Sequence, residues 1–569
     1  GNTRQVRYFD RIFSRLEKDR TQLTAGDYEL RSPDSYFLQY FKKLEGATFS
    51  TNLLDDQGGS WNNSASVAIA RGQFRRQQLV TQEGNQGPYK LQGSSGERFI
   101  IVLAGTEKVI LDGQTLQRGR DADYTIDYNQ GEVTFTARRL VTKDSRIAVE
   151  FEYADQRYLR SLYAGSSHYQ RDRWKAYVNV YSQQDSKTAT GDLELSDDER
   201  QRLQDAGDQL TNAFISTVNS LDAPDSQRAT YSAVDTLINC NGVDSLFQFL
   251  RFDTEGLLVA SFAFVGEGQG NYVLDPTLTA NERAYRWVAP DPNDCRPQGS
   301  YSPIRQLTAP KLQRLITTGG SYQVGKQGEI RAELGYSQED RNRFSRLDAN
   351  NDNGLATRLD WDQKWQLGTD SSGWQLQGGA EYEWVQENFR AINPYRSPEF
   401  LRDWSLASVN GIGNTSPAAE QLAGATLALG HPDKGQIRYR WSSFLRDSLY
   451  EGQRHAAELR WEIKGWEING SNSWLNSTTP VLDTRFTRPN LQLQKKFTRW
   501  NNWQLNLTAQ EERSERTPTG SNELELSSFF FQRYTASLQS PEQEQWQWGT
   551  SFRDRLDYQP QGADFRAAS

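Results

Sequence analysis

The chain has 569 residues, with 65 Lys and Arg against 73 Asp and Glu, which gives a net charge of −8. Both signs of charge are mixed along it, so no basic surface for nucleic acid is expected. Its mean hydropathy is −0.80, and the absence of any run of roughly 18 apolar residues excludes a transmembrane helix. Aromatic residues are frequent for a soluble protein, at 12% with 16 Trp. A membrane β-barrel accommodates both features, because only alternate residues of its strands meet lipid.

Residues 1–86 combine turn residues with strand-like segments, among them 6–9, 36–41 and 64–70. A polar and aromatic alternation begins at residues 26–30, and this pattern is typical of strands whose two faces meet different surroundings. We interpret the region as early strands and loops of a barrel.

The pattern changes between residues 87 and 153, where short apolar segments are separated by tight turns. Asp112-Gly113 and Asn129-Gln130-Gly131 are typical hairpin turns. The short strands predicted around them are 99–103, 108–111, 123–128, 132–136 and 147–153. This spacing predicts a compact β-sandwich of immunoglobulin-like size with its own apolar core. It is a discrete module, because residues 154–190 return to the longer pattern of barrel strands.

Residues 191–312 carry the clearest helix signal, which spans 192–221. Ser196 and Glu199 form a capping box, in which each side chain binds the other residue's backbone amide. A helix cannot belong to a barrel wall, so we expect it in a loop or lid. The rest of the region is irregular apart from a strand at 257–265, and its length predicts a folded extramembrane excursion.

The two cysteines, Cys240 and Cys295, both lie in this excursion, in polar and loop-rich sequence. A metal site would need more ligands nearby, and a reactive thiol more often stands alone with a His partner. We therefore predict a Cys240–Cys295 disulfide, which implies an oxidising compartment.

Residues 313–569 form a long antiparallel meander, with brief polar breaks and longer polar loops in alternation. Along 374–384 the even positions are mostly apolar and the odd positions mostly polar. The strands run to roughly ten to fourteen residues, long enough to cross a bilayer when tilted. Aromatic rings favour the headgroup level. The residues expected to face lipid or form this girdle are Trp374, Trp461, Trp503 and Trp546. A large soluble β-sandwich or solenoid would also show alternation.

The motifs that carry chemistry are few. Asp348, Asn350 and Asp352 place oxygen ligands at alternate positions, as at the start of a calcium loop, so they are a candidate Ca²⁺ site. The Gly of that motif comes one place late and the bidentate Glu is missing, which equally fits a solvated loop between two strands. The three His residues are scattered, and no nucleophile or acid–base pair stands out. The sequence predicts no enzyme and no other cofactor.

Several strings resemble known proteins. Residues 109–135 and 147–153 are similar to a module found in very large outer-membrane proteins of Bacteroidota, including the translocon barrel of type 9 secretion. Residues 264–272, 285–290 and 396–404 look like segments of uncharacterised outer-membrane barrels of that phylum. The resemblance implies the bacterial outer membrane as location, and lipid and other envelope or surface proteins as partners. It brings no catalytic residue.

Together these observations predict an all-β fold: a transmembrane antiparallel β-barrel with an inserted immunoglobulin-like β-sandwich and a small loop and helix excursion. The predicted function is transport, secretion or assembly across the outer membrane, with the sandwich gating the pore as a plug. The alternative is a cell-surface scaffold or adhesin, anchored by the barrel, that binds partner proteins and conducts nothing. Because no signal peptide begins at Gly1, we expect a mature or trimmed chain. The resemblance to outer-membrane barrels implies an aromatic last residue, so the ending 567–569 is interpreted as a truncation.

Overall fold

The computed structural model confirms an all-β protein, with strands that run from β1 to β37 and two short α-helices in the part that it describes. It divides into two compact units, one of residues 1–184, 313–339 and 350–569 and another of 185–312 and 340–349. The described residues are 12–70, 72–93, 100–142, 145–154, 158–189, 195–210, 213–223, 229–240, 243–275, 284–292, 294–368, 373–406, 417–497, 502–541, 548–558 and 565–568.

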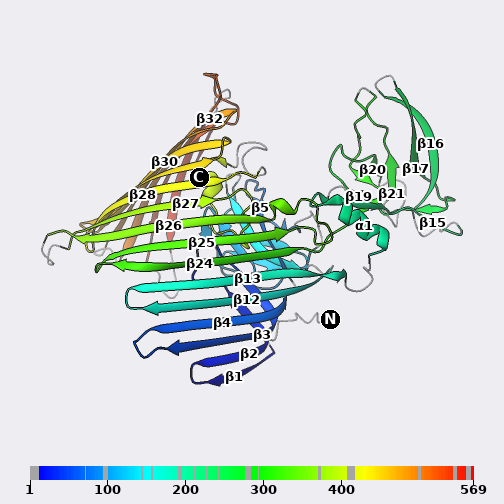
Figure 1. Cartoon of the computed structure of the whole chain (residues 1–569). Helices are drawn as coiled ribbons and strands as arrows, with labels where there is room; N and C mark the ends of the chain where they lie inside the picture. Colours follow the sequence, from blue (N-terminus) through cyan, green and yellow to red (C-terminus); the bar gives the residue numbers. More distant parts are fainter. Residues whose placement is uncertain are drawn as a thin grey trace, which may run out of the picture. The chain divides into compact units, whose positions relative to one another are not determined.

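The first unit is built on a curved antiparallel sheet of 20 strands (Figure 1). These strands are β1 (Phe13–Lys18), β2 (Thr21–Arg31), β3 (Phe41–Leu54), β4 (Ser60–Ala70), β12 (Tyr158–Arg171), β13 (Trp174–Ala189), β24 (Leu312–Val324), β25 (Gly328–Asp340), β26 (Asn353–Gln366), β27 (Gln375–Val385), β28 (Glu420–His431), β29 (Gly435–Arg446), β30 (Tyr450–Ile463), β31 (Trp466–Thr478), β32 (Leu482–Thr487), β33 (Asn490–Phe497), β34 (Trp503–Pro518), β35 (Phe529–Gln539), β36 (Gly549–Tyr558) and β37 (Phe565–Ala568).

Each strand of this sheet pairs with the next one along the chain, with two insertions. One lies between β4 and β12, which pair over their whole length, and the other lies between β13 and β24. Strands β32 and β33 follow each other along the same line between β31 and β34, and each of them pairs with both of these neighbours. Pro489 separates them, because proline has no N–H to donate to a neighbouring strand.

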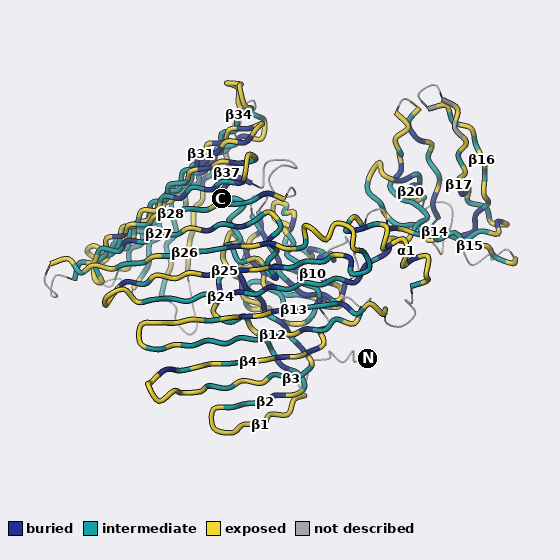
Figure 2. The backbone as a smooth tube through the Cα atoms, viewed as in Figure 1, coloured by how far each residue is buried: buried dark blue, intermediate teal, exposed yellow. Residues whose placement is uncertain are grey.

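The two faces of this sheet differ in the way that the alternation predicts. In β25, Leu334 is 58% exposed whereas its neighbour Glu333 is 5% exposed. The exposed face, here called the outer face, carries large apolar side chains, and the opposite inner face carries many charged and polar ones. Figure 2 shows how more and less exposed residues alternate along the strands. Exposed apolar residues of the outer face include Phe49, Trp61, Val67, Tyr163, Val178, Ile330, Leu355, Leu359, Trp361, Tyr382, Leu427, Ile437, Tyr439, Ile463, Leu491, Tyr534 and Phe552.

The insertion between β4 and β12 is the predicted module, and it consists of two small antiparallel sheets around one core. The first sheet has β5 (Gly72–Leu79), β11 (Ile147–Ala154), β7 (Lys108–Leu111) and β8 (Gln114–Thr115), and the second has β6 (Tyr89–Lys90), β10 (Glu132–Phe135) and β9 (Tyr124–Asp127). Their shared core includes Val102, Val109, Val133, Phe135, Ile147, Val149 and Phe151.

The module starts at Gly72, earlier than the predicted boundary at residue 87. Strand β5 pairs with β11 along its full length, and Leu79 belongs to the module's core. Its sequence, Gly-Gln-Phe-Arg-Arg-Gln-Gln-Leu, lacks both apolar alternation and a continuous apolar run. Sequence patterns alone therefore do not assign it to the module.

The second unit has its own strands and two small cores. Its strands are β14 (Phe214–Ser216), β15 (Asn219–Ser220), β16 (Thr230–Cys240), β17 (Val243–Phe252), β18 (Leu258–Val259), β19 (Ala263–Phe264), β20 (Tyr272–Asp275), β21 (Ala284–Trp287), β22 (Tyr301–Ser302) and β23 (Ile304–Gln306). The region predicted to be irregular is thus largely folded as strands, the longest of which are β16 and β17, and the predicted strand 257–265 is replaced by the two short strands β18 and β19.

The predicted helix is shorter than its sequence signal. Helix α1 (Asp197–Ala206) begins with the predicted capping box, in which the Glu199 amide donates to the Ser196 Oγ at 3.2 Å. It ends at Gly207, whose φ of 58° leaves the helical region. The side chain of Asn342 then donates to the carbonyl oxygens of Leu203 and Gly207, at 2.6 and 2.7 Å. In the described ranges, no helix is both long and apolar enough to cross a membrane.

The predicted disulfide is not formed in this structure, because Cys295 has a free and exposed thiol. Cys240 is the last residue of β16 and pairs through its backbone with Val243. Cys295 follows β21 in a turn of another sheet, with a φ of 60°. The two cysteines thus belong to different sheets, which sequence spacing could not distinguish from neighbouring positions.

The register of β5 leads to a test of the module's boundary. A fragment of residues 72–154 should unfold cooperatively in denaturant. A fragment of 87–153 should be unfolded or much less stable, because β11 loses its partner strand and the core loses Leu79. In the longer fragment, Leu79→Ala should cost about 2–4 kcal/mol of unfolding free energy. Equal denaturation midpoints for the two fragments would contradict this boundary.

Candidate functional site

Two loops of the first unit fold onto the inner face of its sheet. One is residues 32–40, between β2 and β3, and the other is residues 386–406, after β27. Phe37 of the first loop is fully buried and lies 5.4 Å from Phe389 and 5.3 Å from Tyr395 of the second, between ring centroids. The two loops thus pack in one apolar cluster with inner-face residues of the sheet, such as Leu44, Leu162 and Leu315.

Glu333, on the inner face of β25, anchors the first of these loops. Its carboxylate accepts the backbone N–H groups of Tyr36 and Phe37 at 2.8 and 2.9 Å. It also accepts the hydroxyl groups of Ser35, at 2.8 Å, and of Tyr177. A carboxylate buried this deeply needs such donors to replace water, so the loop and the strand stabilise each other.

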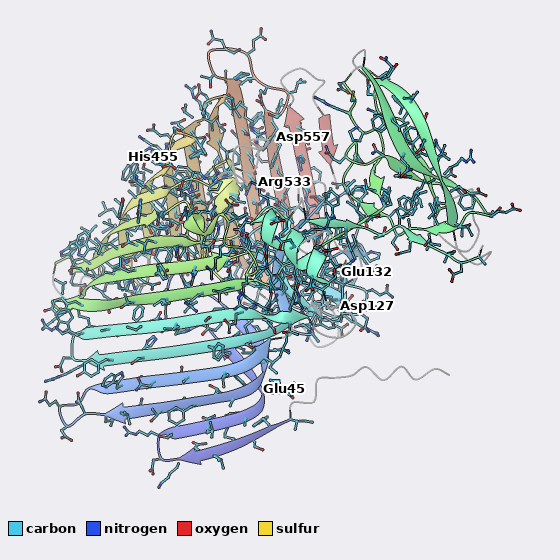
Figure 3. All side chains as sticks on the ribbon, turned by 45° about the vertical axis from the view of Figure 1, so that its right-hand side comes forward. Glu45, Asp127, Glu132, His455, Arg533 and Asp557 are labelled. Atoms are coloured by element: carbon cyan, nitrogen blue, oxygen red, sulfur yellow. The ribbon has the colours of Figure 1, made fainter. Side chains whose placement is uncertain are left out.

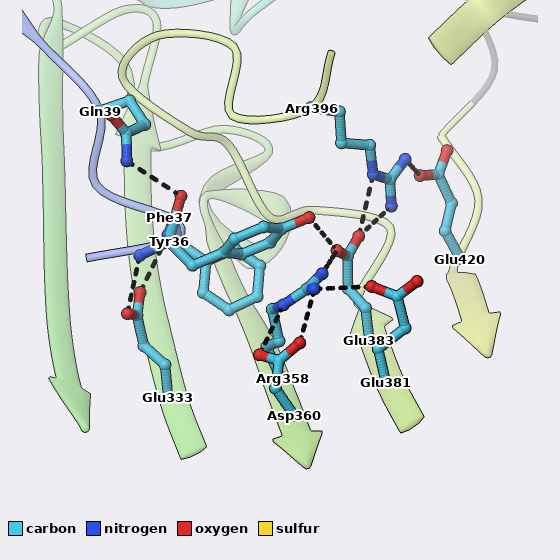
Figure 4. Close-up of polar contacts among 10 residues, drawn as sticks. All are labelled: Tyr36, Phe37, Gln39, Glu333, Arg358, Asp360, Glu381, Glu383, Arg396 and Glu420. Atoms are coloured by element: carbon cyan, nitrogen blue, oxygen red, sulfur yellow. Dashed lines mark hydrogen bonds and ion pairs between the residues drawn. The ribbon is translucent and has the colours of Figure 1, made fainter. Parts of the chain in front are cut away.

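A network of ion pairs lies beside this anchor (Figure 4). Arg358 of β26 contacts Asp360 at 2.7 Å, Glu381 at 2.8 Å and Glu383 at 3.2 Å. Arg396, from the second loop, pairs with Glu383 and with Glu420 of β28. Burial of Arg358, Arg396 and Glu383 is tolerable because each of these three charges has at least two partners of opposite sign.

Tyr36 joins the loop to this network through both its ring and its hydroxyl. The guanidinium of Arg358 lies 3.9 Å from the ring centroid, and the hydroxyl donates to Glu383 at 2.6 Å. Burial raises the pKa of Tyr36 well above its ordinary value, and the negative charge of Glu383 raises it further. The hydroxyl therefore stays a neutral donor at physiological pH.

The module contacts the sheet's inner face through ion pairs. Lys42 of β3 pairs with Glu152 of β11, and both side chains are 3% exposed. Nearby, the Lys43 ammonium donates to the carbonyl oxygen of Ala104 at 2.6 Å. On another side of the module, Arg146 contacts Glu399 of the second loop at 3.3 Å. The module is therefore held by charged contacts, one of them deeply buried.

A cavity of about 950 Å³ lies between the module, the second loop and strands β30–β35. Its lining is rich in charge of both signs, and Figure 3 shows one lining arginine, Arg533 of β35, by label. The charged residues around it are Asp112, Arg146, Glu399, Arg402, Asp403, Arg454, Glu458, Arg488, Glu511, Glu512, Arg516 and Arg533. We refer to it as the inner cavity.

Of the four tryptophans predicted to face lipid or form an aromatic girdle, three lie within the described residues. Trp374, directly before β27, and Trp461 of β30 lie 6.1 Å apart, and the Lys434 ammonium lies 5.6 Å from the Trp374 ring. Trp503 is the first residue of β34. Trp546 lies outside the described residues. The role of these rings at a membrane surface stays a prediction.

The calcium hypothesis also stays a prediction. Asp348 has a φ of 63°, residues 349–351 form a single 3-10 turn, and Asp352 precedes β26. Within the described ranges, no group of three or more His, Cys, Asp or Glu could hold a metal ion.

The residues that form the inner network do not stand out in the sequence. The alternation along 374–384 places Glu383 only among the polar positions of a strand, although opposite charges in phase on consecutive strands are a weak signal of pairing. The register shows that Arg358 and Glu383 lie directly opposite each other. Their partner Tyr36 is more than 300 residues away, and no sequence pattern links them.

Comparisons with known proteins add one local match. A domain of unknown function (DUF8818) matches residues 74–155. The match coincides with the module. No curated protein sequence matches the chain. Among solved structures, the translocation pore of the P pilus usher PapC aligns with 95% of this chain and 80% of its own. The identity is 8% and the TM-score 0.25, and at these values the similarity establishes neither topology nor function.

The ion-pair network leads to a stability prediction. Glu383→Gln should lower the unfolding free energy by about 3–5 kcal/mol, because it leaves Arg396 and Arg358 with less compensation while they stay buried. The matched control is Glu458→Gln on the inner face of β30, whose partner Arg438 is 3.5 Å away and exposed. It should cost less than about 1 kcal/mol. Equal losses in urea unfolding of the detergent-solubilised protein would contradict the assigned role of Glu383.

Proposed function

We propose that this protein is a β-barrel of the bacterial outer membrane that acts in transport, secretion or assembly across that membrane. In this proposal, the outer face of the 20-stranded sheet contacts lipid and the inner face lines a lumen. The pairings extend from β1 to β37, and closure of these two end strands into a barrel is part of the proposal. A barrel without edges is the form in which strands cross a membrane.

The observation that carries the proposal is the apolar character of the exposed outer face. Large aliphatic and aromatic side chains occur on it from β3 to β36, with Leu334, Leu427 and Phe552 more than half exposed. Soluble proteins rarely expose apolar patches larger than a few hundred Å². A surface of this extent is stable when hydrocarbon rather than water covers it.

The inner face supports the same conclusion from the opposite side. Charged residues such as Glu333, Glu383 and Arg358 point away from the apolar surface and pair with one another or with the loops. This distribution is the reverse of a soluble sandwich, in which the apolar faces are buried. It is the arrangement of outer-membrane barrels, whose interior is polar.

We further propose that the module, as an immunoglobulin-like sandwich, is a plug for the lumen. Its contacts with strand β3 and with the second loop are ionic or polar, and such contacts can separate and form again in water. The resemblance of residues 109–135 and 147–153 to a module of Bacteroidota outer-membrane proteins supports the same location.

A non-conducting surface scaffold is the second candidate, and one observation favours it. The Lys42–Glu152 pair is almost fully buried, and separating such a pair without new partners costs about 3–5 kcal/mol. A module fixed in this way would close the lumen permanently and leave binding of envelope or surface proteins as the function.

The two faces of β28 provide a test of the membrane proposal. Leu427→Arg should block stable membrane insertion, because an arginine facing hydrocarbon costs about 2–4 kcal/mol near the bilayer centre. The matched change is Thr426→Arg, whose side chain lines a polar cavity beside Asp360 and Glu381 and should be tolerated. Insertion is measured by heat-modifiable gel mobility in outer-membrane fractions. If both variants insert equally well, the outer face does not contact lipid.

Deletion of the module distinguishes between a conducting barrel and a non-conducting surface scaffold. Deletion of residues 72–154 should raise single-channel conductance and sensitivity to large antibiotics, while the barrel still reaches the membrane. Glu152→Ala should give a smaller increase, because it releases one of the contacts. Unchanged conductance together with lost binding of a surface protein would favour the scaffold.

A further inference from the structure

Two arginines on the inner face share a single carboxylate. Arg454 of β30 and Arg488, between β32 and β33, both contact Asp403, the last residue of helix α2 (Phe400–Asp403). The Arg454 Nη1 lies 3.1 Å from one carboxylate oxygen, and the Arg488 Nη2 lies 2.6 Å from the other. All three side chains are largely buried and line the inner cavity.

The strand interruption at Pro489 determines where Arg488 lies. The backbone N–H of Arg488 donates to the carbonyl oxygen of Ser473 at 2.9 Å, and the Arg488 guanidinium lies 4.8 Å from the Phe486 ring centroid. The Ser473 hydroxyl accepts from the Arg454 Nε at 2.9 Å. The wall thus holds both guanidinium groups in place without help from helix α2.

In contact with the two arginines there is one carboxylate, Asp403, while Glu458 of β30 adds a weaker negative charge near Arg454. The buried Nε of Arg488 has no hydrogen-bond partner among the described residues. Guanidinium groups present planar sets of donors that match a carboxylate well. If Asp403 withdrew, two fixed arginines and a serine hydroxyl would face a cavity of about 950 Å³.

We infer that Arg454, Arg488 and Ser473 form a binding site for a carboxylate-bearing ligand in the lumen, and that Asp403 is its internal occupant. The inference rests on the proposed transport function and names its substrate class. An incoming carboxylate replaces Asp403 on the same donors, so the wall keeps its ion pairs while helix α2 moves. The volume of the inner cavity is large for a single carboxylate and suits a ligand of several residues' size, as a short acidic peptide segment has.

The experiment measures binding of fluorescent tetra-aspartate to the full chain in detergent by anisotropy. Asp403→Asn should bind the peptide about tenfold more tightly than the unchanged protein, because the internal competitor loses its charge. Arg488→Gln, alone or combined with Asp403→Asn, should weaken binding about tenfold relative to its parent. The Arg488→Gln comparison tests the site even if Asp403→Asn does not fold.

Two matched control variants test whether the change in peptide affinity is specific to this site. Asp362→Asn changes an inner-face carboxylate of β26, which contacts Arg331 at 2.8 Å and lines a different cavity. Arg438→Gln removes an inner-face arginine of β29 that lines a different cavity. Both should bind the peptide as the unchanged protein does, within about twofold.

Three results would overturn the inference: equal affinity of Asp403→Asn and the unchanged protein, equal affinity after Arg488→Gln, or tighter binding of inorganic phosphate than of the peptide. The assay requires no membrane and no conduction. Failure of the carboxylate site is therefore distinguishable from failure of the transport proposal, which membrane insertion and conductance decide.

Discussion

The arrangement of the first unit depends on one constraint, which is that charges buried on the inner face of the sheet need partners. Glu333 and Glu383 are almost inaccessible to solvent, and an unpaired buried carboxylate would cost several kcal/mol. Strand neighbours supply only part of the compensation. The loops 32–40 and 386–406 supply the rest, through backbone amides, Tyr36 and Arg396. Folding of these loops and pairing of the strands therefore depend on each other.

The same chain uses two opposite distributions of apolar residues. In the module, apolar side chains of two sheets face each other and are buried, as in a soluble domain. In the large sheet, many large apolar side chains face outward, whereas the inner face combines charged and polar side chains with apolar clusters under the loops. Each distribution is stable only in its own surroundings, so the contrast within one chain is itself an argument for two solvents.

Ion pairs form a continuous path from the module to the sheet through helix α2. Arg146 of the module contacts Glu399, which contacts Arg402 at 3.3 Å, and Arg402 pairs with Glu512 of β34. Asp403, the next residue, contacts Arg454 and Arg488. One short helix thus combines the contact with the module and the internal carboxylate of the proposed ligand site. Displacement of the module would disturb both, which gives the two proposals a common physical basis.

The sequence by itself determined the all-β class, the two faces of the strands, the module's core and the capping box of α1, because these depend on local periodicity and turn chemistry. Only the tertiary structure assigned β5 to the module, ended α1 at Gly207 and separated Cys240 from Cys295. It also brought Tyr36 to Glu383 and Asp403 to Arg488. These contacts join residues far apart in the chain. A charged residue on a strand gives the same alternation in the sequence whether water solvates its charge or a buried partner of opposite charge neutralises it.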